Sequence, residues 1–201
     1  MTKFLLLRHG QTDFTGKLLL GRRPGISLND EGREQARALA SRLSDMPISA
    51  IYSSPLERVA ETAAALAQTH HLSCNISEAF LELDFGNWTN KSIQELESDA
   101  HFKLFNLFRS SARIPGGEMM LEAQMRIVTG LERLRHEHRD QTVAIFSHAD
   151  IIKSAICYYA GIHLDMSQRI EISPASLSIL EIYDETARIV VVNDTSHLSR
   201  L

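Results

Sequence analysis

Residues 3–10 of the chain read KFLLLRHG, and this stretch decides how the rest of the sequence is interpreted. The apolar run at 4–7 is typical of a strand with both faces buried, as in a parallel sheet. It ends in Arg8, His9 and Gly10, two groups that can carry positive charge and a residue that lets backbone approach closely. Such an ending is either a solvated strand end or the floor of an anion-binding site.

Strand-like and helix-like segments alternate along the rest of the chain. The patterns predict further strands at 50–53 and 142–148, two strands joined by a tight turn within 176–194, and helices at 29–43, 54–67, 92–109, 118–138 and 150–160. This alternation predicts an α/β fold, a three-layer αβα sandwich with a mostly parallel central sheet and an antiparallel edge from the terminal hairpin. No linker divides the chain, so we expect a single domain over residues 1–201.

Two of the predicted helices have strong start signals. Ser54 is a candidate N-cap followed by Pro55 at the first helical position, and Glu57 would complete a capping box. Residues 92–95 (SIQE) repeat the capping-box pattern and predict a helix that continues to Arg109.

Composition excludes several classes of protein. The formal net charge of -4 and the pI of about 6.1 argue against a nucleic-acid-binding protein, which normally has a basic face. No apolar run approaches the roughly 18 residues that suggest a membrane span. The only cysteines, Cys74 and Cys157, have no metal-ligand or disulfide-framework spacing, so we expect a reduced, cytoplasmic protein without membrane association.

The sequence gives no reason to expect a metal or a cofactor. Two histidine pairs, 70–71 and 136/138, have no carboxylate or cysteine at ligand spacing and are interpreted as surface residues.

Basic side chains gather where the predicted strands end. Arg8 and His9 follow the first strand, Arg58 lies in the first turn of the helix after the second, and His148 follows the third. In open α/β sheets ligands bind beyond the carboxyl ends of the strands, where these groups would meet. A phosphoryl group would neutralise them, because arginine forks match its oxygens and a helix N-terminus attracts anions.

The same edge of the sheet can supply the chemistry of phosphoryl transfer. A neutral imidazole can act as a covalent nucleophile while arginines balance the charge on the phosphoryl oxygens. The departing alkoxide needs a proton, and the segment LELDFGNW at 81–88 offers Glu82 and Asp84 as candidate acids.

Five motifs then occur in order: LLLRHGQT, SSPLERVAETA, LELDFGNW, PGGE and FSHAD. Together they resemble the histidine phosphatase superfamily, also called the phosphoglycerate mutase-like family, over roughly residues 4–193. The resemblance implies the phosphoglycerate mutase-like form of the αβα sandwich.

The resemblance also implies roles for individual residues. His9 corresponds to the histidine that is phosphorylated, with Arg8 and Arg58 as phosphate-binding arginines. Glu82 corresponds to the proton donor, which leaves Asp84 a structural role. His148 corresponds to the second histidine, which binds the phosphoryl group and supports the transition state.

The chain departs from the family pattern after the first motif. Family members usually have RHGET followed by Trp-Asn, whereas residues 13–15 here are DFT, so Thr15 is a candidate replacement for a phosphate-binding asparagine. Arg22 is a further candidate phosphate contact. The motif at 115–118 (PGGE) is expected to be architectural.

These features predict a metal-independent phosphomonoesterase that acts on a small phosphorylated metabolite through a phosphohistidine intermediate. The absence of a long insertion after Glu82 favours the small phosphatase branch. A phosphoglycerate mutase-type phosphomutase shares the chemistry up to phosphohistidine, and a non-catalytic binder of phosphorylated ligands is a third hypothesis.

The sequence leaves the substrate and the oligomeric state open. The specificity loops are expected at 11–25 and 83–120, where Arg22, Arg23, Arg109 and Arg113 lie near Phe14 and Trp88 and suit an anionic, partly apolar molecule. An apolar patch at 102–108 is expected to be core, with part of it lining the substrate entrance. A homodimer is common among such folds.

Overall fold

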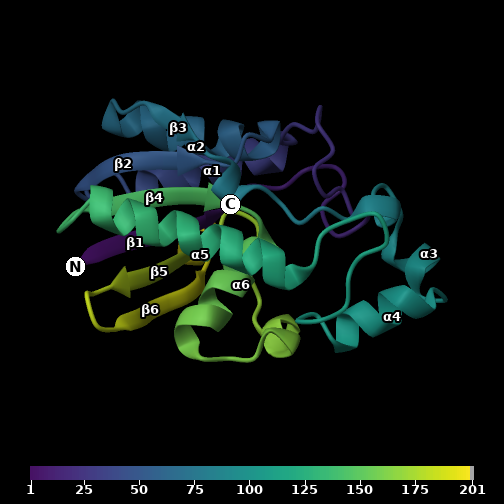
Figure 1. The fold of residues 1–201 in the computed structure, drawn as a ribbon. Coiled ribbons are helices and arrows are strands. Elements are labelled where there is room, and N and C mark those ends of the chain that lie inside the picture. The colour runs from purple at the N-terminus through teal and green to yellow at the C-terminus, as the bar shows by residue number, and fades with distance from the viewer. Residues whose placement is uncertain (200–201) are drawn as a thin grey trace.

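The computed structural model describes residues 1–199, and Figure 1 shows a central sheet with helices on both sides. The six strands are β1 (Thr2–Arg8), β2 (Ile48–Ser53), β3 (Cys74–Ile76), β4 (Thr142–Ser147), β5 (Leu177–Ile182) and β6 (Ala187–Asp194). The α-helices are α1 (Asp30–Arg42), α2 (Glu57–His70), α3 (Ile93–Leu96), α4 (Ala100–Leu107), α5 (Met120–Glu137) and α6 (Ala149–Ala160). Short 3-10 helices lie at Glu78–Phe80, Gly86–Trp88, Leu164–Arg169 and Ser196–Leu198.

The strand order is β3-β2-β4-β1-β5-β6. β1, β2, β3 and β4 pair in parallel, whereas β5 and β6 are antiparallel and form the edge predicted from the terminal hairpin. The predicted fold class, with a mostly parallel sheet, is therefore confirmed.

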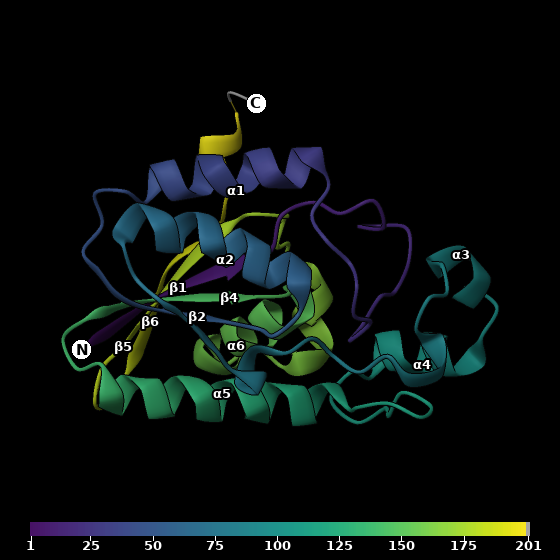
Figure 2. The same ribbon diagram turned by 90° about the horizontal axis from the view of Figure 1, so that it is seen from above.

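The central strands are buried on both faces. In β1, Leu5 and Leu7 pack in a cluster with residues of α1 and α2, whereas Phe4 and Leu6 pack in a cluster with residues of α5 and α6. Figure 2 shows these helix pairs on opposite sides of the sheet. The uninterrupted apolar run of β1 follows from this arrangement, because successive side chains point to opposite faces and neither face meets water.

The start of α2 differs from the prediction. The helix begins at Glu57 with Leu56 as its N-cap, and no side chain caps it. The Glu57 carboxylate accepts a hydrogen bond from the backbone N–H of Gly25, and Ser54 Oγ lies 3.0 Å from His148 Nε2. The predicted capping box is wrong because both of its side chains have tertiary partners instead.

The predicted helix at 92–109 is two helices. The capping box at Ser92 and Glu95 is present, but α3 ends at Leu96. A second cap follows, because the Asp99 side chain accepts from the N–H groups of His101 and Phe102 at the start of α4. Figure 1 shows α3 and α4 to the right of the sheet, beyond the ends of the parallel strands.

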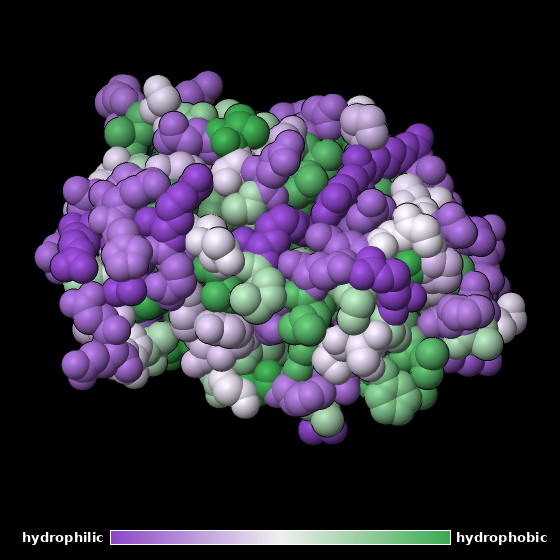
Figure 3. Space-filling view, in the orientation of Figure 1, coloured by the Kyte–Doolittle hydropathy of each residue, from purple (hydrophilic) through white to green (hydrophobic). Residues whose placement is uncertain are grey.

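The apolar patch at 102–108 is partly core and partly surface. Phe105 is buried, whereas Leu104, Leu107 and Phe108 are exposed. Figure 3 shows apolar side chains at the lower right, in the region of α4. Within residues 1–199, no helix is long and apolar enough to cross a membrane.

Candidate active site

Three adjacent parallel strands bring the predicted basic groups together. β4 lies between β1 and β2, so Arg8, His148 and the segment after Ser53 reach the same edge of the sheet. The backbone N–H of His9 donates to the carbonyl of Ser147 over 3.1 Å. The rings of His9 and His148 are consequently 5.3 Å apart, centroid to centroid.

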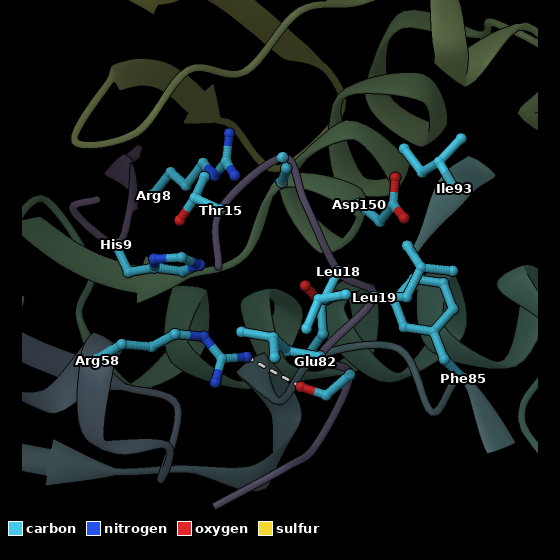
Figure 4. A pocket seen from close by; sticks show the side chains of 14 residues that line it. Arg8, His9, Thr15, Leu18, Leu19, Arg58, Glu82, Phe85, Ile93 and Asp150 are labelled. Carbon is cyan, nitrogen blue, oxygen red and sulfur yellow. Dashed lines mark hydrogen bonds between the residues drawn. The ribbon is translucent and has the colours of Figure 1, made fainter. Parts of the chain in front are cut away.

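His9 is held as a neutral imidazole with one free nitrogen. Its Nδ1 lies 2.8 Å from the carbonyl oxygen of Gly10, which can only accept, so Nδ1 carries the proton and Nε2 keeps its lone pair. Burial, and then the charges of Arg8 and Arg58, hold the pKa of His9 well below its usual range. Figure 4 shows the His9 ring between the side chains of these two arginines.

Gly10 fixes the backbone beneath this ring. Its N–H donates to Thr62 Oγ1 over 3.1 Å, and a Cβ at Gly10 would lie 2.6 Å from the carbonyl oxygen of Gly32. The chain after β1 therefore packs directly on the start of α1, which a larger residue would prevent.

The two arginines are anchored, and each keeps an unsatisfied donor. Arg8 Nη1 donates to the carbonyl of Ile172 over 2.7 Å, and Arg58 Nη2 donates to the carbonyl of Gly21 over 2.9 Å. Among the described residues, buried Arg8 Nε and Arg58 Nη1 have no hydrogen-bond partner. An unsatisfied buried donor costs about 1–3 kcal/mol, so both groups favour a ligand that carries acceptor oxygens.

His148 is also neutral and is oriented by two neighbours. Its Nε2 lies 3.0 Å from Ser54 Oγ, and Arg58 Nη2 lies 3.4 Å from its Nδ1. Because a guanidinium only donates, Nδ1 accepts and Nε2–H donates to Ser54. Burial, and then the charge of Arg58, hold the pKa of His148 well below its usual range.

Glu82, the candidate acid, is one of two carboxyl groups that line the site. Burial first, and then the negative charge of Asp150, raise its pKa to about 7. Its Oε1 accepts from the N–H of Leu83 over 2.8 Å, and its Oε2 lies 3.5 Å from His148 Nδ1. Since His148 is neutral, this contact is not an ion pair.

A cavity of about 170 Å³ is lined by four of these groups, but not by His148. Its lining includes Arg8, His9, Arg58 and Glu82, together with Thr15, Gly16, Leu18, Leu19, Leu20, Gly21, Phe85, Ile93, Ala149 and Asp150. Figure 4 shows the basic groups on one side and Asp150, Leu19, Phe85 and Ile93 on the other. The cavity therefore has a basic end and an apolar end.

The two additional candidates for phosphate binding lie in different places. Thr15 lines the cavity, and its hydroxyl is 2.9 Å from Thr12 Oγ1. Arg22 is absent from the lining; it donates to Glu118 over 2.9 Å and to the carbonyl of Glu82 over 2.9 Å. The motif at 115–118 thus helps to position the Glu82 segment through Glu118.

Sequence reasoning missed two contributors to the site. Ser54 was interpreted as a helix cap, and Asp150 only as the start of a helix, although both lie within the quoted motifs. Asp84, the other candidate acid, accepts from the N–H of Gly86 and is 42% exposed in its side chain, so it lies outside the buried cluster. Within residues 1–199, no group of three or more His, Cys, Asp and Glu side chains could hold a metal ion.

Several known proteins are similar to this chain in sequence and in fold. Phosphoserine phosphatase 1 of Hydrogenobacter thermophilus is 28% identical over 203 residues, which cover 98% of this chain and 95% of that protein. The metal-independent phosphoserine phosphatase of Arabidopsis thaliana is 27% identical over 213 residues, covering 99% of this chain and 84% of that protein. The crystal structure of phosphoserine phosphatase from Entamoeba histolytica in complex with 3-phosphoglyceric acid superposes with a TM-score of 0.89 at 26% identity, covering 98% of this chain and all of that one.

The family assignment rests on nearly the whole chain. The model described as histidine phosphatase superfamily (branch 1) matches residues 4–195, a range that contains all five motifs and every strand except the first residues of β1. The chain therefore belongs to the histidine phosphatase superfamily, branch 1, and is a phosphatase.

Proposed function

We propose that this phosphatase is a metal-independent phosphomonoesterase that hydrolyses a small phosphorylated metabolite through phosphohistidine at His9. The observation that carries the proposal is the state of His9: its Nδ1–H is donated to Gly10, and its free Nε2 shares a cavity with unsatisfied donors of Arg8 and Arg58. A neutral nucleophile beside two fixed cations is suited to an anionic phosphate.

In the first half-reaction, His9 Nε2 attacks phosphorus as the bond to the ester oxygen breaks. Arg8 and Arg58 bind the phosphoryl oxygens, and His148 helps to position Arg58, whose Nη2 lies 3.4 Å from His148 Nδ1. Glu82 gives its proton to the departing alkoxide, a role that a pKa of about 7 permits near neutral pH.

In the second half-reaction, the ionised Glu82 takes a proton from water as that water attacks phosphohistidine. The N–P bond breaks, His9 is regenerated and inorganic phosphate leaves. One carboxyl group thus acts as acid and then as base, which requires a pKa near the working pH.

The test is phosphate release from p-nitrophenyl phosphate in the presence of EDTA. We expect the parent and the control His136→Ala, at an exposed position, to be active, and His9→Ala to be inactive. Brief mixing with [³²P]-labelled substrate should leave acid-labile, base-stable label on the parent and none on His9→Ala. Activity that requires a metal, or that survives in His9→Ala, would overturn the proposal.

We further propose that the chain acts as a single domain of residues 1–201. A homodimer also stays a proposal, which analytical ultracentrifugation tests directly.

A further inference from the structure

The cavity at His9 continues into a second cavity of about 430 Å³. The two share Leu19, Phe85, Ile93 and Asp150, and the second is completed by Phe102, Phe105, Asn106, Arg109 and Gln168. A monoester whose phosphate binds at the basic end would place its alcohol against these residues. The chemistry of the second cavity therefore bears on the substrate class.

The apolar wall between the two cavities is fixed by backbone contacts. Leu18 forms a β-bridge with Ser92, the N–H of Leu19 donates to the carbonyl of Lys91 over 2.9 Å, and the N–H of Asn90 donates to the carbonyl of Leu19 over 2.8 Å. These bonds join the loop before Gly21 to the segment that starts α3. Leu19 and Ile93 are thereby held on one side of a preformed surface, which favours apolar ligands.

The single arginine of this surface is already satisfied. Arg109 Nη1 donates to Asp150 Oδ1 over 3.1 Å, and Nη2 donates to Asn106 Oδ1 over 3.2 Å. Its guanidinium carbon lies 4.8 Å from the centroid of the Phe105 ring. Only 5% of the Arg109 side chain is exposed, so its charge is balanced by Asp150 and is not free to bind a second anionic group.

The other three arginines that suggested an anionic molecule have hydrogen-bond partners as well. Arg22 binds Glu118, Arg113 binds Glu122 over 3.0 Å, and Arg23 donates to Asn90 over 2.7 Å. None of these three lines either cavity. The expectation of an anionic, partly apolar molecule thus has no free arginine to support a second anionic group.

We infer that the phosphatase prefers monoesters of apolar, uncharged alcohols, aryl or medium-chain alkyl, over monoesters whose alcohol carries a carboxylate. The inference rests on the proposed phosphomonoesterase function. An alkyl or aryl group buries apolar area against Leu19, Phe85 and Ile93. A carboxylate in the same place loses its hydration and finds no free cation, because Arg109 is already paired with Asp150.

An n-alkyl phosphate series tests the inference. From ethyl to hexyl phosphate the leaving alcohols have similar basicity, so a change in kcat/KM reports binding of the chain. We expect a rise of about 3-fold per methylene, or about 80-fold over the series. We also expect propyl phosphate to exceed 3-phosphoglycerate and phosphoserine by about 10-fold or more. A flat series, or a preference for either carboxylated ester, would overturn the inference.

Two variants locate the preference in the structure. Ile93→Ser should lower the hexyl-to-ethyl ratio of kcat/KM about 10-fold, whereas Ile76→Ser, at an exposed position on β3 outside both cavities, should keep the parent ratio. Asp150→Asn removes the charge that balances Arg109 and should raise the ratio of 3-phosphoglycerate to propyl phosphate. Ratios that are the same in parent, Ile93→Ser and Asp150→Asn would refute this assignment of the preference.

Binding of phosphonates separates the inference from the proposed function. Hexylphosphonate and 3-phosphonopropanoate cannot be hydrolysed, so calorimetry measures selectivity without turnover. Tighter binding of hexylphosphonate by a protein that hydrolyses no ester would support the inference and overturn the proposed function. Tighter binding of 3-phosphonopropanoate would overturn the inference, whatever the turnover.

Discussion

The basic end and the apolar end of the cavity are built in different ways. The basic end comes from the ends of β1 and β4 and the first turn of α2, where parallel pairing sets the positions of His9 and His148. The apolar end comes from a loop near Leu19 and from α3, which are joined by a few backbone hydrogen bonds. The histidines of the basic end are thus positioned by strands of the sheet, whereas the apolar residues are positioned by a loop and a short helix. We therefore expect mutations at the basic end to change the rate for all esters, and mutations at the apolar end to change the preference among alcohols.

The largest effect is expected from Arg58→Ala, at the basic end. Removal of a buried cation that faces the phosphate should lower kcat/KM about 10²- to 10³-fold for ethyl and hexyl phosphate alike. The control Arg37→Ala, at an exposed position on α1, should match the parent. A changed hexyl-to-ethyl ratio in Arg58→Ala would show that the two ends are coupled.

The effect of Glu82→Gln should depend on how basic the leaving group of the ester is. The amide cannot donate a proton to the alkoxide, so kcat for alkyl phosphates should fall about 10²- to 10⁴-fold. The loss should be much smaller for p-nitrophenyl phosphate, whose leaving group needs little protonation. Glu78→Gln, at an exposed position in the same region, is the control, and equal losses with both kinds of ester would contradict the acid role.

Asp150 lines both cavities and should influence the acid Glu82 through its charge. Its charge is one cause of the raised pKa of Glu82, so kcat/KM of the parent should fall as pH rises through about 7 and Glu82 loses its proton. Asp150→Asn lowers the pKa of Glu82, and the fall should then occur at lower pH. The pH dependence of kcat/KM of both proteins with the same substrate tests this, because the ionisation of the substrate contributes equally to both. If the fall occurs at the same pH in both proteins, the charge of Asp150 is not a cause of the raised pKa.

The smallest effect is expected from Ser54→Ala. Loss of the hydrogen bond from His148 Nε2–H should lower kcat about 2- to 12-fold, which corresponds to about 0.5–1.5 kcal/mol. Ser44→Ala, at an exposed position after α1, should leave kcat at the parent value. If Ser54→Ala changes only thermal stability, Ser54 holds the turn before α2 and does not orient His148.

Local patterns in the sequence determined the layers of the fold and the members of the basic end. The apolar run at 4–7 predicted a buried strand, and the alternation of elements predicted a mostly parallel sheet, whereas the parallel pairing of β1 with β4 is shown by the structure. Arg8, His9 and His148 immediately follow strands, so placing the strands also placed these side chains.

Only the tertiary structure decided how the remaining polar groups are paired. Ser54 has an N-cap pattern, yet it contacts His148, which is 94 positions away and precedes α6, and Glu57 accepts a hydrogen bond from Gly25. Arg109 suggested a free cation, but its partner Asp150 is 41 positions away. Local propensity is set by neighbours in the chain, whereas the charge and hydrogen bonding of a buried group are set by neighbours in space. The neighbours in space decide which end of this cavity is basic and which is apolar.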